Sequence, residues 1–211
     1  MGKIHFITLA IILSVSAHKP ALASAQAAAP ELPQLVTQLQ DPATSEEASI
    51  KLKALAGSNV AARRSLTKEL PELISKTSED HSQYKVWLNS VRLAGELKIE
   101  ESIPVLVTLF EPARYSPSAV STMTSRTTFA NDPVAKALVQ LGQSAIGPVS
   151  GILEDKDKDQ HTRMRAALVL YNMNSPDADA ALAHDLQTET DPRVRSFIEA
   201  RLQMRKKTTN H

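Results

Sequence analysis

The sequence predicts an all-α protein built from repeated helix pairs, and two observations lead to that prediction. Residues 132–155 (DPVAKALVQLGQSAIGPVSGILED) contain two short helices in succession, because apolar side chains recur every three or four residues on either side of Gly142. A proline near the start of an apolar helical stretch recurs at spacings of 38, 33 and 44 residues, at Pro33, Pro71, Pro104 and Pro148. Short helices with one apolar side cannot bury it alone, so we expect copies of the pair to stack in a row.

The pair in residues 132–155 carries recognisable helix signals. Asp132 is a predicted N-cap, and Pro133 follows at the first helical position, where a missing amide costs nothing. Gly142 predicts a left-handed helix stop, and Ser144 is a candidate cap for the second helix. The apolar stripes are Val134, Leu138 and Leu141 in the first helix and Ile146, Val149, Ile152 and Leu153 in the second.

The same pair is expected in about five copies. The recurrent prolines should lie in the first turn of each second helix, because a proline deeper in a helix costs about 3 kcal/mol. Counting 33 residues on from Pro148 reaches Ala181, where we expect the fifth copy without its proline. The first helices should end near Gly57, Gly95 and Gly142. Their predicted core positions are Trp87, Val91, Leu97, Met164, Leu168, Tyr171, Val194, Ile198 and Leu202.

Two stretches carry recognisable repeat motifs. Residues 137–142 read ALVQLG and are followed by AIGP at 145–148, and residues 191–195 read DPRVR. They resemble the ALxxLG…AIPxL and DPxVR signatures of the HEAT-repeat family, in particular its bacterial branch with phycobilisome-lyase-type repeats. The resemblance covers about residues 31–205 and implies a right-handed α-α superhelix (solenoid) whose second helices line the concave side. It implies little about chemistry, since this fold serves many functions.

The first 30 residues predict an export signal. Residues 1–23 have the three parts of a secretory signal peptide, with a positive charge at Lys3, an apolar run and a terminal ALA sequence. Cleavage is expected after Ala23 or Ala25, which leaves residues 24–30 as a flexible tether and an exported protein, periplasmic or extracellular. Retention of the apolar run as a membrane anchor is the alternative, although the run is short for a span.

Composition and missing motifs exclude several classes of protein. Without residues 1–23 the chain has 22 Lys and Arg against 23 Asp and Glu, a net charge of −1, which argues against nucleic-acid binding. The sequence has no cysteine, so disulfides and a thiol nucleophile are excluded. It also lacks a Gly-x-Ser-x-Gly elbow and a phosphate loop. No catalytic residue, cofactor or metal ligand is therefore predicted. The absence of an Asn-x-Ser/Thr acceptor favours a bacterial envelope.

Two patterns that could suggest metal binding are better explained otherwise. Residues 155–159 (DKDKD) place carboxylates as in a calcium loop, but Gln160 and Ala166 stand where that loop needs Gly and Glu. We expect a solvated turn. A HEAT-like iron enzyme uses His-Glu pairs, and this sequence contains no His-Glu dipeptide. His161 is expected to cap a helix start.

The predicted repeat domain covers residues 31–207 and is followed by a disordered tail at 208–211. Both end helices need a polar outer side, because no further repeat covers them. At the C-terminal end this side is assigned to Arg201, Arg205, Lys206 and Lys207, whose charges also complement the helix dipole.

These features together predict a protein–protein interaction module, or scaffold, of the bacterial envelope without intrinsic catalysis. A protein or peptide partner is expected along a concave polar strip formed by Gln34, Gln38, Glu72, Lys76, Thr108 and Ser150. An inserted loop over residues 112–131 is a second candidate contact, with the anchors Arg114, Tyr115, Arg126 and Phe129. A tolerated insertion is the alternative for that loop. The alternatives for the whole chain are a metal- or ligand-dependent enzyme, or an accessory subunit of a larger complex.

Overall fold

The computed structural model describes residues 31–110 and 132–209, and within these ranges the chain is all-α, as predicted. The ten α-helices of these ranges are α2 (Glu31–Leu39), α3 (Ser45–Ser58), α4 (Val60–Thr77), α5 (Tyr84–Glu96), α6 (Ile103–Thr108), α8 (Pro133–Leu141), α9 (Gln143–Glu154), α10 (Gln160–Met173), α11 (Pro176–Thr188) and α12 (Pro192–Thr209). Short 3-10 turns, η1 (His81–Gln83) and η2 (Glu100–Ser102), precede α5 and α6. The predicted signal peptide (1–23), tether (24–30) and inserted loop (112–131) lie outside the described residues.

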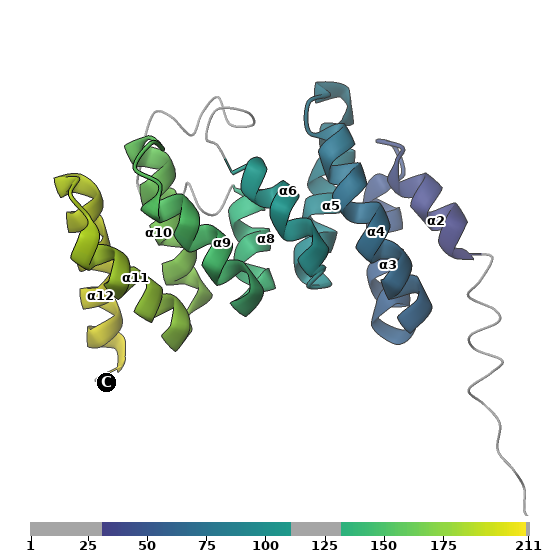
Figure 1. Cartoon of the computed structure of the whole chain (residues 1–211). Coiled ribbons are helices and arrows are strands. Elements are labelled where there is room, and N and C mark those ends of the chain that lie inside the picture. Colours follow the sequence, from purple (N-terminus) through teal and green to yellow (C-terminus); the bar gives the residue numbers. More distant parts are fainter. Residues whose placement is uncertain (1–30, 111–131, 210–211) are drawn as a thin grey trace, which may run out of the picture.

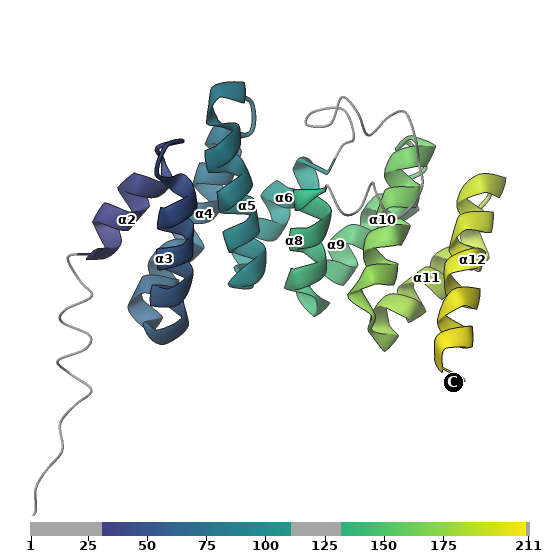
Figure 2. The same cartoon turned by 180° about the vertical axis from the view of Figure 1, so that it is seen from behind.

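Neighbouring helices pack against one another in two layers. Figure 1 faces the layer that contains α4, α6, α9 and α11, and Figure 2 faces the layer that contains α3, α5, α8, α10 and α12. Within each layer successive members are in contact, for example α5 with α8 and α9 with α11. The end helices α2 and α12 lie at opposite ends of the molecule in both views. No helix of the described ranges combines the length and the apolar character that a bilayer span requires.

One continuous apolar core lies between the two layers and confirms the predicted core positions. Trp87, Val91, Leu97, Leu168, Val194 and Ile198 are buried in it. Met164, Tyr171 and Leu202 are partly buried and pack against it. Each helix therefore hides its apolar side against its neighbours, as the periodicity predicted.

The helix signals in residues 132–155 are confirmed with one exception. Asp132 caps α8, since its Oδ1 accepts a hydrogen bond from the Ala135 amide at 3.0 Å. Gly142 ends α8 with a φ of 66°, which a side chain rarely permits. Ser144 does not cap α9. Its hydroxyl instead donates to Glu100 Oε1 at 2.7 Å, which ties α9 to η2.

The first-turn location of the recurrent prolines is correct for Pro33 and Pro104 but wrong for Pro71 and Pro148. Pro71 is the twelfth residue of α4, and Pro148 is the sixth residue of α9. Each removes one backbone hydrogen bond from its helix. In α4 the residue before the proline, Leu70, is fully buried, so tertiary packing along the whole helix offsets that loss. Helix α4 begins at Val60, well before the proline that was predicted to lie in its first turn.

Gly95 lies one residue before the end of α5, close to the predicted helix end, but its main role is in packing. A Cβ atom at Gly95 would stand 2.4 Å from the side-chain oxygen of Gln140 and 2.8 Å from the Cα of Ala137. Only glycine therefore allows α5 and α8 to approach this closely. The left-handed residue after α5 is Lys98, with a φ of 53°. Gly57, at the end of α3, has open space around it.

The predicted fifth copy is α11, and it carries a first-turn proline that counting from Pro148 missed. Pro176 occupies the first turn, and the Ser175 side chain caps the helix by accepting from the Ala178 amide at 3.2 Å. The following helix, α12, extends to Thr209.

Arg205 of α12 folds back on α10, a contact that the sequence did not predict. Its guanidinium donates to the Asn174 side chain and to the Tyr171 carbonyl, and lies 4.5 Å from the centroid of the Tyr171 ring. It also pairs with Asp179 at 3.3 Å. Arg205 thus packs the last helix against α10 and α11, in addition to any effect on the helix dipole.

Candidate functional site

The predicted strip residues occupy α2, α4, α6 and α9. Gln34, Glu72, Lys76 and Thr108 are exposed, whereas Gln38 and Ser150 are half-buried. The Thr108 hydroxyl donates to the Pro104 carbonyl of its own helix at 3.0 Å, which leaves it less available to a partner. The loop anchors Arg114, Tyr115, Arg126 and Phe129 lie outside the described residues. A binding role for the strip remains a prediction.

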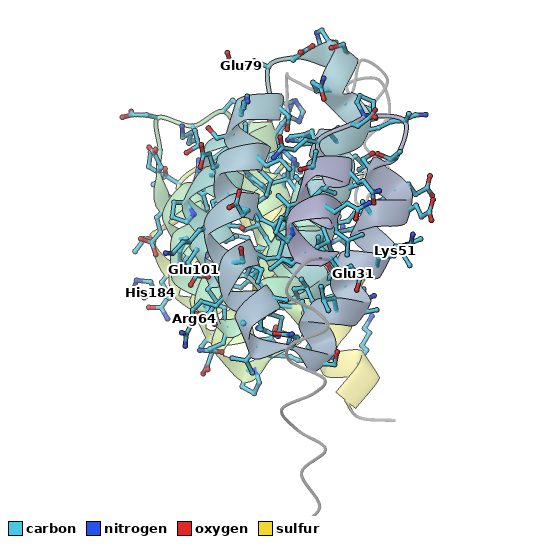
Figure 3. All side chains as sticks on the ribbon, turned by 90° about the vertical axis from the view of Figure 1, so that its right-hand side faces the viewer. Glu31, Lys51, Arg64, Glu79, Glu101 and His184 are labelled. Carbon is cyan, nitrogen blue, oxygen red and sulfur yellow. The ribbon has the colours of Figure 1, made fainter. Side chains whose placement is uncertain are left out.

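The exposed side of the layer formed by α4, α6, α9 and α11 carries charged groups. Figure 3 shows Arg64 of α4, Glu101 of η2 and His184 of α11 along one side of the molecule, with Lys51 of α3 on the opposite side. We call this side the α4–α11 face. It consists of the outer surfaces of α4, α6, α9 and α11.

On the α4–α11 face, Ser150 meets two carboxylates. The Ser150 hydroxyl lies 3.4 Å from Glu154 Oε1, one turn further along α9, and 3.5 Å from Asp185 Oδ2 on α11. Both are long hydrogen bonds, and a hydroxyl has a single proton to donate. Ser150, Glu154 and Asp185 are called the Ser150 cluster below. It joins the two helices at a point that local sequence could not indicate.

Asp185 is the unusual member of the Ser150 cluster. The residue is 0% exposed, and its Oδ1 has no hydrogen-bond partner among the described residues. Burial, reinforced by the nearby negative charge of Glu154, raises the pKa of Asp185 to about 6, against the smaller opposing effects of Lys156, His184 and the Ser150 hydrogen bond. The carboxyl group therefore changes its charge near neutral pH while it is short of hydrogen-bond donors.

Two glycines of α9 lie close to Ser150 in the sequence of this helix. Gly147 and Gly151 are exposed on α9, and a Cβ atom added to either would meet no atom within 4 Å. Across from them, α11 exposes Ala183 and His184. Another backbone or a long side chain can approach α9 closely here.

A second buried carboxylate, Glu189, lies just after α11 and is fully satisfied. It pairs with Arg163 and with Lys156 at 3.1 Å, and accepts a hydrogen bond from the Asp191 amide at 2.7 Å. Burial alone would raise the pKa of Glu189, but the Asp191 amide, the Lys156 hydrogen bond and the Arg163 charge together lower it below its usual value. Arg163 also donates to the Leu153 carbonyl at 3.0 Å. This network joins neighbouring helix pairs and leaves no unused acceptor comparable to that of Asp185.

The acidic segment at 155–159 is a turn, as predicted, but its helix cap is a different residue. The Asp159 side chain accepts from the His161 and Thr162 amides at 2.8 and 3.1 Å, so Asp159 caps α10 and His161 does not. Asp155 Oδ1 accepts from the Asp157 amide at 3.0 Å. Within the described ranges no three His, Asp or Glu side chains are grouped as metal ligands.

Arg165 of α10 holds the two chain segments that flank residues 111–131. Its guanidinium donates to the Phe110 carbonyl, pairs with the Asp132 carboxylate, and lies 4.2 Å from the centroid of the Phe110 ring. Phe110 is fully buried. The two described ends, at Phe110 and Asp132, are therefore held together by one side chain.

A scan against protein-family models and a search of curated proteins find no match to this chain. The features established by the structure are thus its helices, the packing between neighbours and the Ser150 cluster.

Sequence reasoning identified Ser150 but missed Glu154 and Asp185. One signal for Asp185 was present, because Ala178, Leu182 and Asp185 follow helical spacing and are all buried on α11. A carboxylate in an apolar stripe marks a buried charge that needs a partner.

Proposed function

We propose that this chain is an exported HEAT-like α-solenoid that serves as a protein–protein interaction module of the bacterial envelope, without catalysis of its own. The layered packing of successive helices supports a repeat array, in which each pair is stabilised by its neighbours. The signal-like residues 1–23 support export.

The partner binds on the α4–α11 face. The observation that carries this proposal is the buried Asp185 carboxylate beside Ser150 and Glu154, whose Oδ1 has no hydrogen-bond partner among residues 31–110 and 132–209. Buried polar atoms are almost always satisfied in folded proteins, and a donor group from a partner would satisfy this one. The predicted strip residues Glu72 and Thr108 are exposed on the same layer of helices.

Crosslinked capture from a bacterial envelope fraction tests this proposal. The mature chain is compared with a strip variant that combines Glu72→Gln, Thr108→Val and Ser150→Ala. A matched control carries Glu46→Gln and Ser49→Ala on α3, in the other layer. We expect a specific protein to be captured by the wild type and the control and lost with the strip variant. Capture that is unchanged by the strip variant refutes the assignment of this face.

A further inference from the structure

We propose that the Ser150 cluster binds a cationic side chain, a lysine ammonium or an arginine guanidinium, on a peptide segment of a protein partner that lies across α9 and α11. This inference rests on the proposed function, because it gives the chemistry of the partner at one point of the α4–α11 face.

The carboxylates of the Ser150 cluster have too few hydrogen-bond donors. Glu154 Oε1 and Asp185 Oδ2 each lie within 3.5 Å of one hydroxyl, the Ser150 Oγ, and are therefore no more than about 7 Å apart. That hydroxyl donates to only one of them at a time, and Asp185 Oδ1 has no donor within the described part of the chain. An ammonium group brings three donors and a guanidinium five, and neither brings an acceptor. A cationic group therefore supplies what the cluster lacks.

The charged groups around Asp185 favour a cationic ligand. The groups that face Asp185 are Glu154 from α9, Lys156 just after α9, and His184 next to it on α11. Lys156 is already paired with Glu189 at 3.1 Å, so its charge is shared with a second buried carboxylate. The cluster thus keeps uncompensated negative charge when Asp185 is ionised, in surroundings where water screens it weakly.

The Ser150 cluster can be reached from the surface of the protein. Glu154 is exposed, Ser150 is half-buried and Asp185 is fully buried, so the cluster runs inward from solvent through Ser150. Exposed glycines on α9 border it, with open space where their side chains would be. A long, unbranched cationic side chain suits this shape, because its stem lies over the glycines while its charged head contacts Glu154 and Ser150. At Ser150 the head is separated from Asp185 by one hydroxyl group, close enough for its charge to act on that carboxylate.

Binding of charged and neutral peptides to the mature chain tests the proposal directly. The probes are two capped pentapeptides, Gly-Ala-X-Ala-Gly with arginine or lysine at X, and two neutral controls with citrulline or norleucine at X. Carbon-13 NMR of the Asp185 carboxyl follows each titration. We expect at least one cationic peptide to bind tenfold or more tightly than its neutral counterpart. Equal binding of the charged and neutral peptides overturns the proposal.

The pH dependence gives a second readout. A proton on Asp185 competes with the cation, so affinity should rise about tenfold between pH 5 and pH 7 for a group that titrates near 6. Asp185→Asn should weaken binding and remove most of this dependence. His184→Gln should retain it, because the competing proton is on Asp185. An unchanged pH profile in Asp185→Asn contradicts the assignment.

Steric and surface variants keep the test independent of folding. A Cβ atom at Gly151 would meet no described atom within 4 Å, so Gly151→Leu adds its side chain at an open position of α9 and should block the peptide, whereas Gly57→Leu, at a similarly open position of α3, should bind normally. Glu154→Gln changes an exposed residue and should weaken binding at least threefold. Circular dichroism confirms that each variant is folded. Normal binding by both Gly151→Leu and Glu154→Gln overturns the proposal.

The outcomes separate this inference from the proposed function. If the strip variant loses the envelope partner but the cationic peptides show no preference over their neutral controls, the cationic site is wrong and the interaction module stands. If cationic peptides bind as expected and no partner is captured, the site stands and the proposed function fails.

Discussion

Replacing Asp185 with asparagine should stabilise the protein at neutral pH and leave its stability at pH 4 nearly unchanged. The pKa of Asp185 rises from 3.8 to about 6 on folding, so the folded protein holds this proton more tightly than the unfolded chain does. The stabilising effect of that proton is complete below pH 3.8 and is lost as the pH rises through about 6. Above that range the folded protein contains an ionised carboxylate that is buried and short of donors.

The size of the expected stabilisation follows from the pKa shift of Asp185. Each pKa unit corresponds to 1.36 kcal/mol, so a rise of about two units means that the ionised group costs about 3 kcal/mol at neutral pH. Asparagine has nearly the same shape and no charge, but its amide group also requires hydrogen-bond partners. We therefore expect Asp185→Asn to increase the free energy of unfolding by about 1–3 kcal/mol at pH 7.5 and by less than about 0.5 kcal/mol at pH 4.

Urea unfolding followed by circular dichroism, at several pH values between 4 and 8, measures this difference. A carboxylate that shares no partner with Asp185, such as Asp159, changes the stability of the wild type and the variant equally, so its contribution cancels in the difference. Asp177→Asn, an exposed change on the same helix, is the matched control and should show no pH-dependent gain. A difference between Asp185→Asn and wild type that is constant from pH 4 to pH 8 refutes the reasoning.

Four further substitutions, one of them a control, test the packing. Gly95→Ala should cost about 1–2 kcal/mol, because overpacking at the α5–α8 contact outweighs the gain in helix propensity, while Gly57→Ala, in open space, should be neutral or slightly stabilising. The urea midpoint of Gly95→Ala should be lower than that of Gly57→Ala. Equal midpoints would contradict the close contact between α5 and α8. Arg165→Met should lower stability by about 2–3 kcal/mol through lost hydrogen bonds and ring contact, as measured by urea unfolding; a change below about 0.5 kcal/mol argues against the anchor. Arg163→Met leaves the buried Glu189 carboxylate with one cation fewer and should cost about 3 kcal/mol at pH 7, and this cost should fall as acid protonates that carboxylate. A loss of stability that does not change with pH opposes the ion-pair account.

The features that were predictable from sequence are those set by local physics. The apolar stripes of residues 132–155 repeat at helical spacing, and Asp132 caps a helix through an amide only three residues away. Such signals need no knowledge of distant residues. They were sufficient for the all-helical fold and for most of the core.

The errors arose where distant contacts decide the local outcome. Pro71 disfavours a continuous helix, yet α4 runs through it because buried residues on both sides pack against other helices. Ser144 is a plausible cap, but Glu100, 44 residues earlier, takes its hydroxyl. Arg165 joins Phe110, 55 residues away, to Asp132, a contact that no local pattern indicates. The Ser150 cluster was missed for the same reason, because Asp185 reaches Ser150 only when α9 and α11 pack together.

Asp185 and Glu189 are both buried, but Glu189 is surrounded by cations and donors and Asp185 is not. This difference predicts how a bound cation affects stability. Glu189 has two cations and a backbone amide, so a further cation gains little there. Asp185 has a long contact to one hydroxyl and a like-charged neighbour. A ligand that binds only the folded state stabilises it by RT ln(1 + [L]/Kd), about 1.4 kcal/mol at ten times Kd. At pH 7.5 the arginine or lysine pentapeptide should therefore raise the urea midpoint of the wild type, and it should do so much less for Asp185→Asn. Equal stabilisation of both proteins would locate the cation elsewhere, because Asp185→Asn leaves the Glu189 network intact.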